Sequence, residues 1–260
     1  MQKRYPPVYS LSELDQMKKQ GQSYYFLRRA HIEDGYRAAK GKGMTFRACN
    51  ASLFGYLHNE SMNVFSHLAP ALYFTIHFLL AVTGTASYSV LQTWQSRMFM
   101  ALVAFGHSFD MWTSVAYHLY NTLGRQAAER LLAFDLSGIV AVMLGNFIVL
   151  AYHLFSDWSW ERNLIMGVVT PLIVSNFFVL FHPKFLKDSM HCCKVIVIAA
   201  TQVLLFSTAI AGRVYYGSDY HVEEIYPRLF TAFSSVTLGF GFWLSHYPER
   251  IHCLGKHRTV

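Results

Sequence analysis

Residues Gly106–Gly138 read GHSFDMWTSVAYHLYNTLGRQAAERLLAFDLSG, and both the predicted fold and the candidate site depend on these residues. Two apolar segments flank a short polar turn, which we place at Asn121–Arg130. Each apolar segment belongs to a longer apolar run of about 20 residues, which is enough to form a membrane-spanning helix. A short turn makes the two helices an antiparallel pair, so His118 and Asp135 are expected near the same membrane surface.

Polar and ionisable residues interrupt both apolar segments. In the first segment they follow one another at spacings of three, four and four, which places them on one face of a helix. These residues are His107, Asp110, Ser114 and His118. Because an ionisable group inside a membrane span is costly, such a face indicates a functional site.

The composition of the whole chain agrees with a membrane protein. Of 260 residues, 53% are hydrophobic and only 14% are charged, whereas a soluble domain carries about 25% charged residues. The net charge of +7 does not indicate a nucleic-acid partner, because the basic residues cluster beside apolar spans. We therefore predict an all-α integral membrane protein whose partners include the lipid bilayer but no nucleic acid.

The apolar runs predict a single helical bundle over residues 66–247. It follows a basic, interfacial arm (1–65), in which a short helix is predicted from Ser12 to about Lys19, and it precedes a tail (248–260). Six spans are expected in the bundle, at 66–86, 98–120, 131–154, 163–183, 193–213 and 226–247.

The distribution of basic residues predicts the orientation. With the N-terminus in the cytoplasm, 18 of the 22 lysines and arginines lie on the cytoplasmic side, 10 of them on the arm. Basic residues are retained on that side of a membrane. A cytoplasmic arm and tail are therefore predicted.

A polar motif, HNESMNVFSH, precedes the first span. Its Glu60, Asn63 and His67 share one helical face. One interpretation is an interfacial turn that satisfies backbone groups where the helix enters the membrane. The other is a fixed hydrogen-bond network that lines the cytoplasmic mouth of the bundle.

Ser114 and His118 lie one helical turn apart and can face one centre. A neutral imidazole suits zinc, but a catalytic zinc site has about three protein ligands, and Asp135 could serve as a ligand or deprotonate a bound water. Alternatively, His118 and Asp135 form a structural hydrogen-bonded pair. The remaining candidate ligands are the tail histidines, whose spacings of six and five do not suit one helical face: His246, His252 and His257.

Four motifs together resemble the progestin and adipoQ receptor family, which is related to the haemolysin III proteins. They are HNESMNVFSH, Ser114-xxx-His118, FDLSGI around Asp135, and Pro248-Glu249-Arg250. The DGYRA of the arm (34–38) and the HPKFL at 182–186 resemble the Golgi Raf-kinase-trapping branch in particular.

The resemblance implies seven spans with a cytoplasmic N-terminus, and a zinc ion bound by one histidine of the second span and two of the seventh. It makes His118 a zinc ligand, Asp135 the carboxylate that holds the zinc-bound water, and Ser114 a neighbour of the metal. The seventh-span motif is not found in these 260 residues, so two histidine ligands are missing unless the tail histidines or a partner chain supply them.

Three functions follow as hypotheses. The first is a receptor-like scaffold or regulator of the Golgi or another internal membrane, whose arm (1–65) recruits a cytosolic partner such as a Raf-type kinase, with a lipid or steroid as a candidate ligand. The second is a zinc-dependent hydrolase of a lipid amide such as ceramide. The third is an inactive truncated form that lacks the seventh span.

Overall fold

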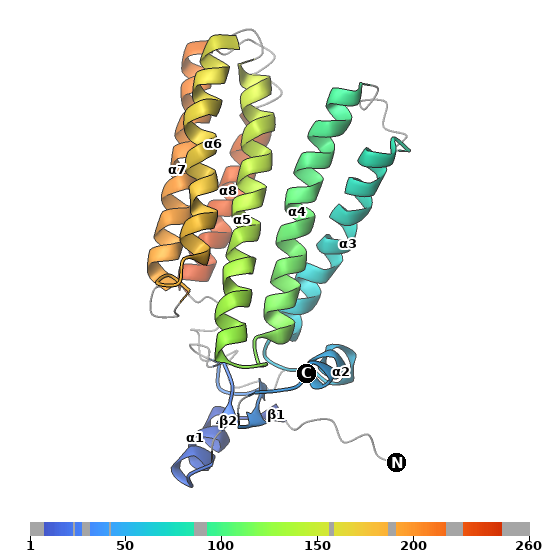
Figure 1. Ribbon diagram of the computed structural model, residues 1–260, viewed down its shortest axis with the longest axis vertical. Helices are drawn as coiled ribbons and strands as arrows, with labels where there is room; N and C mark the ends of the chain where they lie inside the picture. The colour runs from blue at the N-terminus through green and yellow to red at the C-terminus, as the bar shows by residue number, and fades with distance from the viewer. Residues whose placement is uncertain are drawn as a thin grey trace. The chain divides into compact units, whose positions relative to one another are not determined.

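Helices dominate the computed structural model of the chain. It describes residues 8–22, 24–27, 32–41, 43–85, 93–155, 159–186, 191–216 and 226–245. Six long helices occupy the positions of the six predicted spans (Figure 1): α3 Ser61–Thr83, α4 Trp94–Tyr120, α5 Arg125–Leu154, α6 Ser159–Phe181, α7 His191–Tyr216 and α8 Tyr226–Ser245. The predicted all-α membrane fold is confirmed.

Within the described ranges, four helical segments are long and apolar enough to cross a membrane by length and composition: Ser61–Thr83, Arg125–Leu154, Ser159–Phe181 and Cys193–Gly212. α4 is not among them, because polar residues such as His107 and Asp110 interrupt its apolar run. The polar face of α4, which marks it as a candidate functional helix, therefore also lowers its mean hydropathy.

The turn between α4 and α5 is shorter than predicted. α5 begins at Arg125, so Asn121–Gly124 form the turn and the next six residues are helical. Gly124 has φ +150°, a conformation that favours glycine, and its carbonyl accepts the first helical hydrogen bond from the Ala128 N–H (2.9 Å). The polarity of residues 125–130 indicated a loop, but these residues form the beginning of α5.

The chain divides into two compact units. Unit 1 comprises residues 1–68, 114–132 and 236–260, and unit 2 comprises residues 69–113 and 133–235.

In unit 2, small and hydroxyl-bearing residues connect neighbouring helices. Gly138 of α5 lies against α4, where an added Cβ would stand 2.5 Å from the Asp110 Cα. Between α3 and α4, the Thr75 and Ser108 hydroxyls are 2.7 Å apart, and the Trp112 indole donates to the Thr75 oxygen (2.9 Å). Close backbone approach and interhelical hydrogen bonds are typical of helices packed in a membrane.

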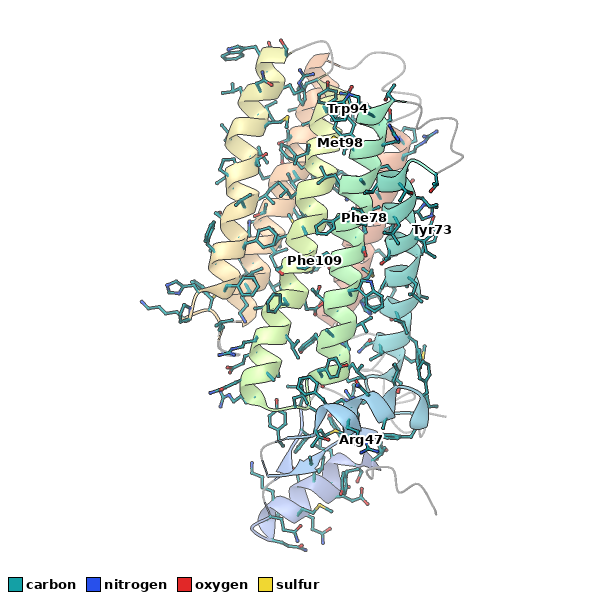
Figure 2. All side chains as sticks on the ribbon, turned by 45° about the vertical axis from the view of Figure 1, so that its right-hand side comes forward. Arg47, Tyr73, Phe78, Trp94, Met98 and Phe109 are labelled. Carbon is teal, nitrogen blue, oxygen red and sulfur yellow. The ribbon has the colours of Figure 1, made fainter. Side chains whose placement is uncertain are left out.

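Helices α6 and α7 of unit 2 lie side by side (Figure 1). The Asn176 amide of α6 donates to the Thr201 hydroxyl of α7 (3.1 Å). Large apolar side chains on other helices of the unit point outward instead, including Tyr73, Trp94 and Met98 (Figure 2). Such exposure is expected of surfaces that face lipid.

In unit 1, the arm folds into short elements around a small core (Figure 1). Its helices are α1 Leu11–Lys19 and α2 Phe46–Gly55. β1 (Val8–Tyr9) pairs antiparallel with β3 (Tyr36–Arg37), and β2 (Tyr24–Tyr25) pairs antiparallel with β4 (Ala39–Lys40). Buried Leu14, Tyr36 and Ala38 form the core. α2 and both strand pairs had not been predicted from the sequence.

α1 begins at Leu11 with Ser10 as its N-cap, whereas the sequence predicted a helix from Ser12. The Ser10 hydroxyl accepts from the Glu13 N–H (3.2 Å), and the Glu13 carboxylate accepts from the Ser10 N–H (2.7 Å). This reciprocal capping box needs a serine three residues before the glutamate. Ser12 is too close to Glu13 to form it.

Candidate functional site

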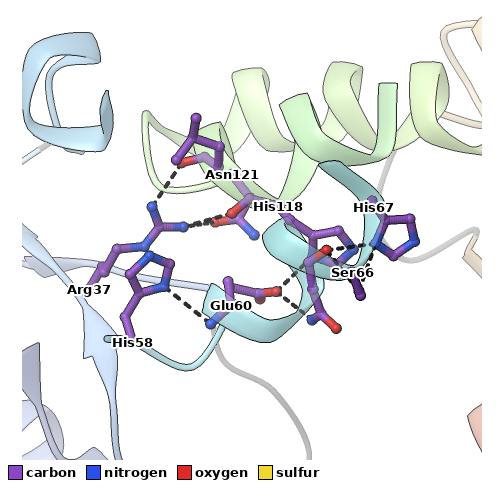
Figure 3. Close-up of polar contacts among 9 residues, drawn as sticks. Arg37, His58, Glu60, Ser66, His67, His118 and Asn121 are labelled. Carbon is purple, nitrogen blue, oxygen red and sulfur yellow. Dashed lines mark hydrogen bonds and ion pairs between the residues drawn. The ribbon is translucent and has the colours of Figure 1, made fainter. Parts of the chain in front are cut away.

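The glutamate that precedes α3 pairs with the histidine near the end of α4. Glu60 is 2% exposed, and its Oε2 lies 2.7 Å from His118 Nδ1 (Figure 3). The same oxygen accepts from the Asn63 amide at 2.9 Å. An ionised carboxylate only accepts hydrogen bonds, so His118 Nδ1 carries the proton. The Nε2 lone pair of His118 then remains as an acceptor or a metal ligand.

His67 lies beside this pair on the next turn of α3. Its Nδ1–H donates to the Asn63 carbonyl oxygen (2.6 Å), and its ring stacks on the His118 ring with centroids 5.5 Å apart. The structure therefore brings together Glu60, Asn63 and His67, the three residues that share a face in the sequence, and adds His118 to them (Figure 3).

A buried arginine of β3 holds the end of α4. Arg37 is 2% exposed and donates to four acceptors. Its contact with Asn121 is drawn in Figure 3. Its Nη1 contacts Ser52 Oγ (3.0 Å) and the Leu119 carbonyl (2.9 Å), and its Nη2 contacts the His118 carbonyl (2.7 Å) and Asn121 Oδ1 (3.4 Å). The last carbonyls of a helix carry partial negative charge, so a cation is favourable there.

Burial lowers the pKa of Arg37, and the nearby acidic groups, including Glu60, act in the opposite direction. We had not predicted the role of Arg37 from the sequence. The only signal was its place in the DGYRA motif, because three of its four acceptors lie more than 80 residues further along the chain.

His58, the first residue of the HNESMNVFSH motif, is close enough to Arg37 and Glu60 for both charges to act on its imidazole. Its Nδ1 accepts from the backbone N–H of Glu60 (3.2 Å), and its backbone N–H donates to the Ser61 hydroxyl (2.9 Å). Burial, and then the positive charge of Arg37, lower the pKa of His58 to about 3, while Glu60 raises it in part. His58 is therefore neutral at physiological pH and is fixed as a hydrogen-bond acceptor.

The other predicted site residues are distributed differently. Ser114 is buried on α4, one turn before His118 in unit 1. Asp135 lies on α5 in unit 2. The tail histidines, His246, His252 and His257, lie outside the described residues.

The described part of the chain contains no group of three or more histidine, cysteine, aspartate or glutamate side chains placed to hold a metal ion. His118 does fit the role of one ligand, since a metal-binding imidazole almost always donates its second N–H to a carboxylate or carbonyl. Glu60 is that carboxylate. The described residues thus supply one oriented ligand of the approximately three that a catalytic zinc site needs.

Comparison with known proteins places this site in a family context. The family model described as "Haemolysin-III related" matches residues 55–256. Progestin and adipoQ receptor family member 3 of Homo sapiens is 28% identical over 229 residues, which cover 85% of this chain and 70% of that protein. Heptahelical transmembrane protein 1 of Arabidopsis thaliana is 23% identical over 210 residues, 77% of this chain and 61% of that protein. The chain therefore belongs to the haemolysin-III-related family of multi-pass helical membrane proteins, within its progestin and adipoQ receptor group.

Proposed function

We propose that this membrane receptor-like protein is a signalling regulator of an internal membrane such as the Golgi, and that its folded arm recruits a cytosolic partner, a Raf-type kinase. A lipid or steroid that binds among the helices would be its ligand. The similarity to the progestin and adipoQ receptors supports the receptor-like character. The bonding of Arg37 supports the role of the arm.

Arg37 carries this proposal because it joins two parts that are distant in the sequence. Its backbone is part of a strand of the arm, while its guanidinium holds the carbonyls of His118 and Leu119 on α4. The side chain of His118 is in turn fixed by Glu60 at the start of α3. A ligand that shifts α3 or α4 would change the acceptors of Arg37, and the arm would respond through a contiguous hydrogen-bond network.

A recruitment assay tests this proposal. Cells would express the full chain, a chain without residues 1–60, or the Arg37→Ala variant, and the fraction of a Raf-type kinase on internal membranes would be measured. We expect recruitment by the full chain, loss of recruitment in the deletion and a reduced response in Arg37→Ala. The Arg125→Ala variant is the control, because Arg125 is 78% exposed in the same unit. Recruitment that survives the deletion of the arm, in a chain that still inserts in the membrane, would refute the docking role.

A second candidate function, zinc-dependent hydrolysis of a lipid amide, is favoured by the Glu60–His118 pair. Glu60 orients the imidazole so that Nε2 is available to zinc. A bound zinc would supply Lewis-acid polarisation of the amide carbonyl. Asp135 would hold and deprotonate the attacking water, with Ser114 beside the metal, and the tail histidines or a partner chain would provide the missing ligands.

Elemental analysis of the detergent-purified chain decides between the two functions. About one zinc per chain, absent from His118→Ala and bound roughly 10–100-fold more weakly by Glu60→Gln, would favour the hydrolase. If neither the full chain nor the His118→Ala variant contains zinc, His118 has a structural role and the regulator remains. A rate of ceramide hydrolysis that is the same in the His118→Ala variant as in the original chain would also exclude the hydrolase.

A further inference from the structure

Helix α2 exposes two phenylalanines, with the polar Asn50 between them on the same face, and buries two small side chains. Cys49 and Ser52 are fully buried, whereas Phe46 is 63% and Phe54 is 81% exposed. A helix that faces water shows the opposite pattern. The outward face of α2 therefore matches an apolar surrounding.

This outward surface continues toward α3. Leu57 is 50% exposed, and Met62 on the first turn of α3 is 77% exposed. The rings of Phe54 and Phe65 contact each other across the two helices, with centroids 5.9 Å apart. We call Phe46, Phe54, Leu57 and Met62 the outer apolar face.

The position of α2 along the chain fixes what can cover this face. α2 ends at Gly55, and α3, long and apolar enough to span a membrane, begins at Ser61. The five connecting residues reach less than about 20 Å even when fully extended. Because the first turn of a spanning helix lies at the membrane surface, α2 is held within reach of the lipid headgroups.

Charge identifies the leaflet. Arg47, exposed on α2 (Figure 2), follows Phe46 directly and lies two turns before Phe54 on the same helical face. The arm contributes 10 of the 22 lysines and arginines of the chain. Basic and aromatic residues together are typical of helices that lie in the interface of an anionic membrane.

We propose that α2 is an interfacial anchor, whose outer apolar face inserts between the lipids of the anionic leaflet from which α3 starts, while Arg47 contacts their phosphates. The inner face of α2 is attached to the site, because Ser52 Oγ accepts from Arg37 and the Cys49 sulfur lies 3.6 Å from Thr122 Oγ1. Anchoring α2 in lipid thus fixes the position of the residues that hold Arg37.

Photocrosslinking in vesicles tests the anchor. The full chain is reconstituted in phosphatidylcholine vesicles, with or without phosphatidylserine. A benzoylphenylalanine probe replaces Phe54 in one sample and Gln16 in the other, and lipid adducts are measured by mass spectrometry. Gln16 is the matched control, because it is exposed on α1, a polar helix of the same arm.

We expect several-fold more lipid adduct at position 54 than at position 16. We also expect phosphatidylserine to increase the adduct at 54, and the Arg47→Gln variant to remove that increase. Equal adducts at the two positions would overturn the proposal. So would a probe at 54 that reacts with a second protein chain and not with lipid, because the outer apolar face would then be a protein interface.

Discussion

Replacing Arg37 with alanine should release the arm from α4. The guanidinium is buried and donates to Ser52 and Asn121 side chains and to the carbonyls of His118 and Leu119. Hydrogen bonds that involve a charged group contribute about 1.5–3 kcal/mol each, and the desolvation of the guanidinium offsets part of their sum. The acceptors of Arg37 are neutral, and leaving a buried acceptor without a partner costs about 1–3 kcal/mol, so a net loss of about 3 kcal/mol is expected.

Hydrogen exchange can measure this cost locally. The Met44 N–H donates to the Thr122 carbonyl (2.8 Å), and the Asn59 N–H donates to the Gly35 carbonyl (2.9 Å). Both bonds report on the closed arm. A loss of about 3 kcal/mol makes the open state roughly a hundredfold more populated, so both amides of Arg37→Ala should exchange about that much faster.

The control is Arg125→Ala, which removes an arginine that is 78% exposed and pairs with Glu129 at 3.2 Å. An exposed ion pair contributes at most about 1 kcal/mol, so little acceleration is expected at the reporter amides. If Arg37→Ala accelerates the exchange of Met44 and Asn59 no more than Arg125→Ala does, the guanidinium does not hold the arm and our account of the site is wrong.

Three further predictions concern pH and close packing. Because the pKa of His58 falls from 6.5 to about 3 on folding, its contribution to the free energy of unfolding is intact above pH 6.5; below that it should fall by about 1.4 kcal/mol per pH unit until about pH 3. His58→Asn should abolish this slope in denaturation measurements across pH, and a slope that persists would exclude His58 as the source. Gly43→Ala should destabilise unit 1 by roughly 3 kcal/mol or more, because φ is +143° and the new Cβ would collide with the Leu123 carbonyl. The control is Gly41→Ala, where φ is +85° and the new Cβ would meet open space, so the cost should be only about 1–2 kcal/mol. Equal losses of thermal stability in the two variants would contradict the steric argument. Gly138→Ala should cost about 1–3 kcal/mol by forcing α5 away from α4, since an added Cβ would lie 2.5 Å from the Asp110 Cα, and an unchanged melting temperature of the detergent-purified protein would show that the helices can separate freely.

The polar face of α4 shows which features of the apolar spans follow from the sequence. Spacing placed His107 and Asp110 on one helical face, and both lie on α4 as expected. What they contact was not predictable: His107 stacks on Phe74 of α3 with centroids 4.6 Å apart and hydrogen-bonds Asn146 of α5. The partners come from two other helices, and their register against α4 is set by interhelical packing.

The sequence alone determined the membrane class, the positions of the six long helices and the common face of Glu60, Asn63 and His67. These properties depend on composition and on spacings of a few residues, which the covalent geometry of a helix converts directly into faces and lengths. The tertiary packing, in contrast, pairs Glu60 with His118, 58 residues away, and places Arg37 at the end of α4, more than 80 residues away. Contacts at such separations are set by how the elements pack, and no local periodicity in the sequence encodes them.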